Sequence, residues 1–284
     1  MGLTEHLSGV AVVIGSASGM GHATAISYAR YGVRGLIVAD INEPGVRKTA
    51  EEAKRDATHP NFEVLALFTD VRSFESVENV FNKAVEKFGR IDYSVTTAGI
   101  WKTQGLLADN PLDNYEDIMN TNARGVLYHT KAAIRVMRRQ EPQVVQGEDR
   151  ARVIGRGSIV NVASDAGIDA YPGSVEYNAS KAAAISITKT AANEYGPLGI
   201  RINAVCPGPI HTPLLERALA EMPGARVPTE QSTSFGRIGD PQEVADAILF
   251  LTSAVGGFVH GTAMLVDGGA VNNIPGFGNL SLQN

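Results

Sequence analysis

The segment Val10 to Gly21, VAVVIGSASGMG, decides the fold, because a short β-branched run passes directly into a glycine cluster and then into a helix-forming sequence. Gly15, Gly19 and Gly21 form the pattern GxxxGxG. Glycines at a strand-to-helix junction let the backbone approach a pyrophosphate, whose charge is favourable at the N-terminus of the helix. No Gly-Lys-Thr or Gly-Lys-Ser sequence follows the glycine cluster, which excludes a P-loop for ATP or GTP. The segment therefore predicts a dinucleotide-binding unit.

The rest of the chain repeats this alternation of strand and helix patterns. It predicts six more strands, at 35–40, 62–68, 91–96, 158–162, 200–205 and 263–266, and helices at 20–31, 43–56, 73–88, 112–139, 175–195 and 241–253. Such alternation implies right-handed βαβ crossovers and a parallel sheet. We therefore predict a single α/β domain over residues 1–284, with a Rossmann-type, doubly wound sheet of seven parallel strands and helices on both faces.

Three segments depart from the alternation. Residues 140–156 combine Pro, Gly and mixed charges, and we interpret them as a solvated insertion within the domain. Residues 207–237 are irregular, and residues 270–284 form a C-terminal tail.

Composition narrows the class of protein. Of the 284 residues, 44% are hydrophobic and 19% are charged, which is typical of a soluble globular domain. A net charge of −5 disfavours a nucleic-acid or anionic-membrane surface. The N-terminus lacks a signal-peptide pattern and no apolar run reaches membrane-spanning length, so we expect a cytoplasmic protein without a membrane partner. The single Cys206 excludes an internal disulfide and is expected to be a buried thiol; the six His residues are scattered, so no metal site is predicted.

Asp40 ends the second predicted strand, 19 residues after Gly21. At this spacing an acid can bind the adenosine ribose hydroxyls of a dinucleotide. A carboxylate there repels the 2′-phosphate of NADP, so NAD is the expected cofactor. The neighbouring residues supply no cation that would reverse this preference: Ser16, Ala17, Ser18 and Ile41.

The segment VEYNASKAAAISITKT, residues 175–190, places Tyr177 and Lys181 four residues apart at the start of an Ala-rich helix. This spacing puts both side chains on one helical face. At an effective dielectric of about 20 and a separation of about 6 Å, the lysine charge would stabilise a phenolate by roughly 2.8 kcal/mol, or about two pKa units. We therefore expect Lys181 to bring the tyrosine pKa towards neutrality, where general acid–base catalysis is most efficient.

Together these residues resemble the short-chain dehydrogenase/reductases of the single-domain type, over nearly the whole chain from Leu7 to Gly269. The insertion leading into RGSIV is similar to members of fungal secondary metabolism. The resemblance is carried by the three glycines, Asp70-Val71, Ala98-Gly99, Asn122, Ser164 and the Tyr177 to Lys181 pair, with Ser164 standing 13 residues before Tyr177.

The resemblance implies a catalytic set of Asn122, Ser164, Tyr177 and Lys181. In it, Tyr177 exchanges the proton with the substrate oxygen and Lys181 binds the nicotinamide ribose. Ser164 hydrogen-bonds the substrate oxygen, and Asn122 helps to hold a water of the proton relay. The full set of expected cofactor-binding residues is Gly15, Ser16, Ser18, Gly19, Met20, Gly21, Asp40, Ile41, Asp70, Val71, Ala98, Gly99, Asn122, Tyr177, Lys181, Pro207, Gly208, Ile210 and Thr212.

Two positions depart from the family pattern. The usual Asn-Asn-Ala-Gly is Thr96-Thr97-Ala98-Gly99 here, and the usual threonine before the first glycine is Ile14. Both positions act through backbone or strand-bracing contacts, so we expect a β-branched residue to substitute.

The resemblance also implies a substrate lid over about residues 209–237 and a homo-oligomer, a tetramer or a dimer, built on helices 112–139 and 175–195. The lid leucines, with Trp101, Ile168 and Tyr171, predict a mainly apolar substrate cavity, and periodicity places neither Arg217 nor Arg226 inward. We expect NAD-dependent oxidation of a largely apolar, cyclic secondary alcohol. The alternatives are an NADPH-type ketoreductase of polyketide or acyl substrates, a lyase or epimerase, a non-catalytic NAD-binding regulatory protein and, least favoured, a serine hydrolase.

Overall fold

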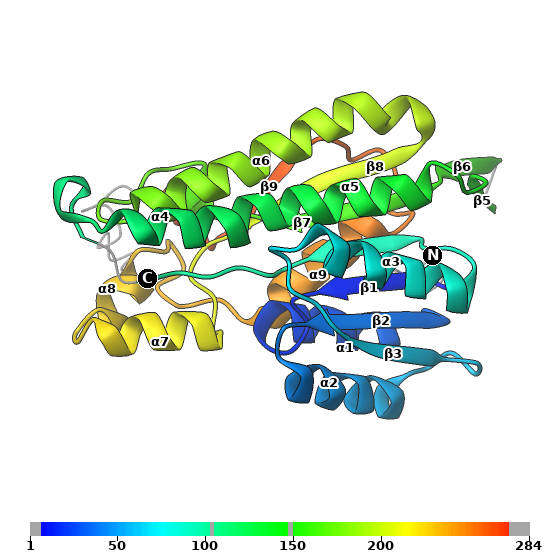
Figure 1. Cartoon of the computed structure of the whole chain (residues 1–284), viewed down its shortest axis with the longest axis horizontal. Helices are drawn as coiled ribbons and strands as arrows, with labels where there is room; N and C mark the ends of the chain where they lie inside the picture. The colour runs from blue at the N-terminus through cyan, green and yellow to red at the C-terminus, as the bar shows by residue number, and fades with distance from the viewer. Residues whose placement is uncertain (1–6, 103–104, 147–149, 273–284) are drawn as a thin grey trace, which may run out of the picture.

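Seven parallel strands form the central sheet of the computed structural model, which describes residues 7–102, 105–146 and 150–272 (Figure 1). Their spatial order is β3-β2-β1-β4-β7-β8-β9, so the order reverses between β1 and β4. The predicted seven-stranded Rossmann-type sheet is confirmed. The strands are β1 (Val10–Ile14), β2 (Gly35–Asp40), β3 (Glu63–Phe68), β4 (Tyr93–Thr96), β7 (Gly157–Val162), β8 (Ile200–Pro207) and β9 (Ala263–Val266).

Helices cover both faces of the sheet. One core cluster joins the sheet to α1 (Gly19–Arg30), α2 (Glu43–Asp56) and α9 (Pro241–Thr252). A second cluster joins the opposite face to α3 (Phe74–Phe88), α5 (Gly125–Met137) and α6 (Val175–Tyr195). Because both faces are covered, every residue of β1 and β8 is buried. This burial explains the continuous apolar sequence of β1, whereas β8 also buries the polar side chains of Arg201 and Asn203. Cys206 is one of these buried β8 residues, as expected.

The insertion at 140–156 contains a hairpin that the sequence interpretation missed. Strands β5 (Gln143–Gln146) and β6 (Ala151–Gly155) pair antiparallel as a separate two-stranded sheet. The β-branched pairs Val144-Val145 and Val153-Ile154 were the available signal, and the charged and glycine residues between them obscured it. Residues 147–149 of the insertion lie outside the described residues, as does the tail beyond residue 272.

The predicted helix at 112–139 is confirmed, and it is interrupted by one π-helical turn. It comprises α4 (Leu112–Ile118), a π-helical turn at Met119–Arg124, and α5. A π turn inserts one residue into the helical repeat and is often found at functional sites. Here it contains Asn122.

The segment 207–237, expected to be irregular, contains two short helices within the predicted lid, α7 (Pro213–Glu221) and α8 (Arg226–Gln231). They lie at one end of the molecule, across from α4 and the N-terminal end of α6 (Figure 1). Thr212 caps α7 by accepting a hydrogen bond from the backbone N–H of Leu215 (3.3 Å). This cap fixes the start of the lid next to the glycine loop.

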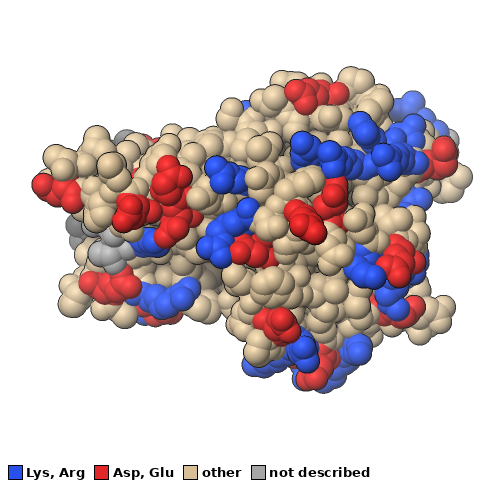
Figure 2. Space-filling view, in the orientation of Figure 1, with Lys and Arg blue, Asp and Glu red and all other residues tan. Residues whose placement is uncertain are grey.

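Charges of both signs are interspersed over the face shown in Figure 2, with basic side chains gathered along α5. Arg135 of this group pairs with Glu78 (2.5 Å) and lies over the ring of Phe74 (5.1 Å to the centroid). In the described part of the chain, no helix combines the length and the apolar character that a membrane span needs. The absence of a nucleic-acid partner and the cytoplasmic location stay predictions.

A buried arginine on β8 holds the C-terminal end of α9. The guanidinium of Arg201 donates to the carbonyls of Leu251 (2.5 Å), Thr252 (2.9 Å) and Ser253 (3.0 Å), and also to that of Gly256 (3.0 Å). The last carbonyls of a helix have no partner within the helix, and they carry the negative end of its dipole. Arg201 therefore satisfies them with a cation, although burial lowers its own pKa to about 10.

We expect Arg201→Met to lower the free energy of unfolding by about 2–4 kcal/mol, because it leaves several buried carbonyls without a donor. Chemical denaturation followed by far-UV circular dichroism measures this change. The control is Lys87→Met, which breaks the exposed Lys87–Glu63 pair (2.5 Å) and should cost less than about 0.5 kcal/mol. Equal effects of the two substitutions would contradict the capping role.

Candidate active site

The glycine loop between β1 and α1 is shaped by close backbone approach. Gly15 has φ +89° and Gly19 has φ +55°, a region that favours glycine. A Cβ atom on Gly21 would lie 2.1 Å from the Gly15 carbonyl oxygen. These three positions therefore require glycine, and the predicted GxxxGxG motif makes the turn from β1 into α1.

The N-terminus of α1 is free of side chains that would compete with an anion. Ser18, its N-cap residue, makes no side-chain capping bond, and the first turn carries no acidic residue. The positive end of the helix dipole therefore faces the groove with its own N–H groups, an arrangement that suits a pyrophosphate.

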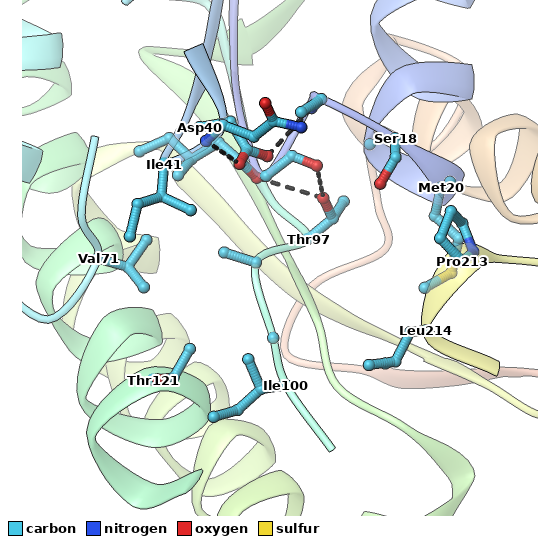
Figure 3. Close-up of a pocket in the computed structure, with 18 of the residues that line it drawn as sticks. Ser18, Met20, Asp40, Ile41, Val71, Thr97, Ile100, Thr121, Pro213 and Leu214 are labelled. Atoms are coloured by element: carbon cyan, nitrogen blue, oxygen red, sulfur yellow. Dashed lines mark hydrogen bonds between the residues drawn. The ribbon is translucent and has the colours of Figure 1, made fainter. Parts of the chain in front are cut away.

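Thr97 replaces the family's asparagine and braces this loop. Its hydroxyl donates to the carbonyl of Gly15 (2.9 Å) and to that of Ile14 (3.3 Å). Figure 3 shows Thr97 beneath the loop, on the side away from Ser18. The expectation that a β-branched residue can serve at this position agrees with these contacts.

Asp40 ends β2 with its carboxylate at the edge of the groove (Figure 3). One oxygen, Oδ2, accepts from the backbone N–H of Ala17 (3.0 Å), and Oδ1 accepts from that of Asn42 (2.9 Å). Each carboxylate oxygen has a further lone pair, so the group is oriented and still able to accept from a ligand hydroxyl.

Beyond Asp40, two apolar side chains form a slot. Ile41, which is 57% exposed, and Val71 point towards the same space in Figure 3. Their neighbour Asp70 is engaged by Arg72 through a bidentate ion pair with a shortest distance of 2.6 Å, which lowers the pKa of Asp70. The slot suits a flat, uncharged ring such as adenine.

The start of α7 closes the opposite wall of the groove. Pro213 and Leu214 lie on the same side as Met20, across the groove from Ile41 and Val71 in Figure 3. Arg217, one turn further along, also lines the groove, a position that helical periodicity could not assign. Helix α7 packs its Ala218 and Leu219 inward, and this orientation leaves Arg217 on the groove side. The other lid arginine, Arg226, pairs with Glu216 (2.5 Å).

The resulting groove has a volume of about 520 Å³ and follows the carboxyl ends of the strands at the reversal point between β1 and β4. Most of the predicted cofactor residues line it: Gly15, Ser18, Gly19, Met20, Gly21, Asp40, Ile41, Asp70, Val71, Ala98, Gly99 and Thr212. Its donors, its carboxylate and its apolar slot fit a nicotinamide dinucleotide.

Several predicted cofactor residues do not line this groove. Ser16 is buried, and its hydroxyl donates to the Ala39 carbonyl (3.3 Å), so its side chain has a structural role. Ile210 is buried beside Gly239. Asn122, Tyr177 and Lys181 lie beyond the Gly99 end, and the remaining two are Pro207 at the end of β8 and Gly208 next to it.

Lys181 and Asn122 meet at Gly99. A Cβ atom on Gly99 would lie 3.4 Å from both Lys181 Nζ and Asn122 Oδ1. Lys181 is buried, donates to the Val162 carbonyl (3.2 Å) and lies 5.6 Å from the centre of the Tyr177 ring. Burial lowers the pKa of Lys181 to about 8.

The expectation that Lys181 brings the Tyr177 pKa towards neutrality was wrong for the protein alone. Burial raises the pKa of Tyr177 to about 12, while a hydrogen bond with Ser164 opposes the rise and Asp165 adds to it. Desolvation of the phenolate is the largest of these effects, and Lys181, whose buried ammonium donates to the Val162 carbonyl, is not among them.

Asn122 joins three elements through its side chain. Its Nδ2 donates to the Ile100 carbonyl (2.9 Å) and to Ser180 Oγ (3.1 Å), and its Oδ1 accepts from the Ile100 N–H (2.8 Å). Both amide hydrogens are thus engaged, and the residue fixes the loop after β4 against α6. Its predicted role in holding a water stays a prediction.

Sequence reasoning missed Asp165 beside Ser164, and it gave Tyr171 only as a wall of the substrate cavity. Asp165 accepts hydrogen bonds from Ser164 Oγ (2.8 Å) and from the hydroxyl of Tyr171 (2.8 Å). The adjacency of Ser164 and Asp165 was visible in the sequence, but the return of Tyr171 to Asp165 depends on the turn between them. Within the described ranges, no cluster of three His, Cys, Asp or Glu side chains could hold a metal ion.

Comparison with known proteins agrees with this geometry. Residues 15–271 match a family model described as enoyl-(acyl carrier protein) reductase. The chain is 40% identical over 264 residues to the short-chain dehydrogenase srdC of Neurospora crassa, covering 93% of this chain and 97% of that protein. It is 36% identical over 262 residues to the 3-oxoacyl-[acyl-carrier-protein] reductase FabG of Thermotoga maritima, covering 92% and 97%.

A solved structure agrees as well. The crystal structure of levodione reductase superposes with a TM-score of 0.83 at 30% identity, covering 94% of this chain and 99% of that one. The chain belongs to the short-chain dehydrogenase/reductase family, whose members are oxidoreductases that bind a nicotinamide cofactor.

Proposed function

We propose that this protein is an NAD(H)-dependent oxidoreductase that transfers a hydride between nicotinamide and a largely apolar secondary alcohol or its ketone. The observation that carries the proposal is the meeting of Ser164, Tyr177 and Lys181 beyond the Gly99 end of a groove that has Asp40 at its other end. A bound nicotinamide supplies the hydride acceptor or donor. The protein supplies the position of the substrate and the proton.

In this proposal Tyr177 is the proton carrier. Its raised pKa keeps the phenol protonated at neutral pH, which suits proton donation to a carbonyl. Alcohol oxidation needs the phenolate, so its rate should rise with pH as Tyr177 ionises. Ser164 binds the substrate oxygen, and Lys181, whose ammonium lies near Gly99, binds the nicotinamide ribose.

NAD is the proposed cofactor because of the oriented Asp40 carboxylate. Its two oxygens are held by backbone N–H groups, so it cannot easily turn away from a 2′-phosphate, and it would repel one. One observation favours the NADPH-type ketoreductase alternative, namely that Arg72 lines the same end of the groove. However, its guanidinium is engaged with Asp70, which neutralises it.

An apolar rim supports the substrate class. Figure 1 places the loop before α4, the start of α6 and the helices α7 and α8 at the same end of the molecule. Exposed apolar side chains are found on these segments and on the turn that leads into α6: Leu106, Leu107, Leu112, Ile168, Tyr171, Val175, Met222 and Val227. Exposed apolar groups around a cavity are typical of a binding site for an apolar ligand. Phe235, counted among the lid residues, is instead 72% exposed beside Arg237.

The rivals of other classes have less support. A non-catalytic NAD-binding protein would not need the intact set of Asn122, Ser164, Tyr177 and Lys181. A lyase or epimerase would regenerate its cofactor, so net NADH production distinguishes it.

We expect Tyr177→Phe to lower kcat by about 10² to 10⁴, the range for loss of a general acid or base, while NAD binding survives. The test is a panel of neutral cyclic alcohols and ketones and of small charged hydroxy acids, followed by NADH absorbance, with NAD affinity measured by calorimetry. Tyr195→Phe, at the far end of the same helix, is the control and should retain activity. A Phe variant with more than about a tenth of wild-type kcat would refute the role.

For cofactor choice, we expect NAD to exceed NADP in kcat/KM by about tenfold or more, equivalent to about 1.4 kcal/mol. Asp40→Ser removes the charge and should reduce the preference. Glu43→Gln, an exposed neighbour paired with Arg47 (3.1 Å), should leave it unchanged. Equal or better use of NADP by the wild type would show that Asp40 does not select the cofactor.

We also propose a homo-oligomer, a tetramer or a dimer, paired through α5 and α6. These helices lie side by side (Figure 1). Between them is a hollow lined by Leu127, Ile134, Ile187 and Ala191, with Leu127 46% exposed. Light scattering at micromolar concentration should give a multiple of 30.1 kDa. Leu127→Glu should reduce the mass, whereas Val85→Glu on α3 should not. A monomeric wild type would contradict this proposal.

A further inference from the structure

The carboxylate of Asp165 is buried directly behind the proposed catalytic serine. The residue is 5% exposed, yet no cation lies within hydrogen-bonding distance of it among the described residues. Three groups donate to it instead: Ser164 Oγ (2.8 Å) and the Ala166 N–H (2.7 Å) to Oδ1, and the Tyr171 hydroxyl (2.8 Å) to Oδ2. Burying an ionised carboxylate with only neutral hydrogen-bond donors costs desolvation free energy, and burial raises the pKa of Asp165.

The serine hydroxyl has only one proton. Ser164 Oγ accepts from the Ala166 N–H (3.2 Å), an N–H that can only donate. Its own proton is directed to Asp165 Oδ1. The same hydroxyl is also the hydrogen-bond partner that stabilises a phenolate at Tyr177. Asp165 and a Tyr177 phenolate are therefore two acceptors for a single proton.

The charge of Asp165 favours the neutral form of Tyr177. From the same loop, the Tyr171 hydroxyl faces Asp165 and the exposed Asp169 acts on Tyr171, while the charge of Asp267, just after β9, acts on Asp165. From β8 comes the neutral thiol of Cys206, and from α6 come Tyr177 and Lys181, the cation of this group. Lys181 donates to the Val162 carbonyl and makes no hydrogen bond to Asp165.

We propose that Asp165 is a positioning residue that competes with Tyr177 for the single proton of Ser164, so that Tyr177 keeps its own proton and is held as the donor to a substrate oxygen. The inference rests on the proposed roles of Ser164 and Tyr177. Asp165 itself touches neither substrate nor cofactor in this arrangement, and it acts through Ser164. Tyr171 supports it by holding the second carboxylate oxygen.

Asp165→Asn is a substitution of nearly unchanged shape. Because the Ala166 N–H can only donate, the amide oxygen must take the place of Oδ1, and the amide nitrogen then faces Tyr171, whose hydroxyl can accept. Ser164 thus keeps its partner, but a neutral amide oxygen is a weaker acceptor than a carboxylate. The Ser164 proton becomes more available to a Tyr177 phenolate.

The test follows the ionisation of Tyr177 directly, in the full-length protein without substrate. The protein is labelled with tyrosine carrying ¹³C at Cζ, and the Tyr177 signal among the eight tyrosines is assigned from its loss in Tyr177→Phe. Spectra are recorded between about pH 7 and pH 11, around the ordinary tyrosine pKa of about 10, with circular dichroism to show that each sample is folded. This readout does not require turnover, so the proposed function can fail while this inference stands.

In wild type we expect Tyr177 to remain largely neutral at about pH 10, where an ordinary tyrosine is about half ionised. In Asp165→Asn the ionised fraction at pH 11 should rise by at least about threefold, a pKa decrease of about half a unit. Asp169→Asn, an exposed carboxylate of the same loop, is the control and should match wild type. Superimposable titrations of wild type and Asp165→Asn would overturn the proposal.

The Ser164→Ala background separates the hydrogen-bond route from charge acting through space. In this background, Asp165→Asn should change the pKa of Tyr177 by less than about half of the change that it causes in the wild-type background, as expected for coupled residues. A full effect in that background would overturn the route through Ser164.

If Asp165→Asn does not fold, Tyr171→Phe replaces it as the test. This variant keeps the charge of Asp165 and removes one of its hydrogen-bond donors, so the carboxylate should hold the Ser164 proton more strongly and the ionised fraction of Tyr177 should fall. An unchanged or increased ionised fraction would overturn the proposal.

Discussion

The close approach of two backbone segments, Gly15 at the end of β1 and Gly21 in the first turn of α1, is the constraint on which the site depends. The Gly15 carbonyl lies where a Cβ atom on Gly21 would be, so no other residue fits there without moving the helix. This contact lets the bare N-terminus of α1 face the groove, and Thr97 holds it from β4. The position of the helix dipole, and hence of a pyrophosphate, follows from a steric requirement.

At the other end of the groove, desolvation rather than charge pairing determines the chemistry. Tyr177 and Lys181 have the spacing that would let an ammonium stabilise a phenolate, but burial disfavours both charged forms. The tyrosine proton is therefore held in the protein alone. The buried carboxylate of Asp165 acts in the same direction, because it draws the Ser164 proton away from Tyr177.

The proposed substrate side and the cofactor side of the site are built from different kinds of elements. The cofactor groove is built from β-strand ends and backbone N–H groups, with little freedom to change. The substrate rim is built from the loop before α4 and from α7 and α8, where apolar side chains are exposed (Figure 1). Asn110 joins this rim to the start of α6 by donating to the buried Glu176 (3.1 Å), so the loop is positioned relative to Tyr177. A cofactor groove built on strand ends, with the proposed substrate rim built on loops and short helices, suits a fold that serves many substrates.

The sequence by itself determined the sheet, the glycine turn and the residue types of the site, because strand and helix periodicity, glycine conformation and the i, i+4 spacing of Tyr177 and Lys181 are local properties. It also predicted that Asp40 selects the cofactor, which stays a prediction. The tertiary structure alone decided the pKa of Tyr177, the inward position of Arg217 and the contact of Tyr171 with Asp165. These depend on burial and on the orientation of one segment against another, and such quantities are set by packing across the fold rather than by neighbours in the chain.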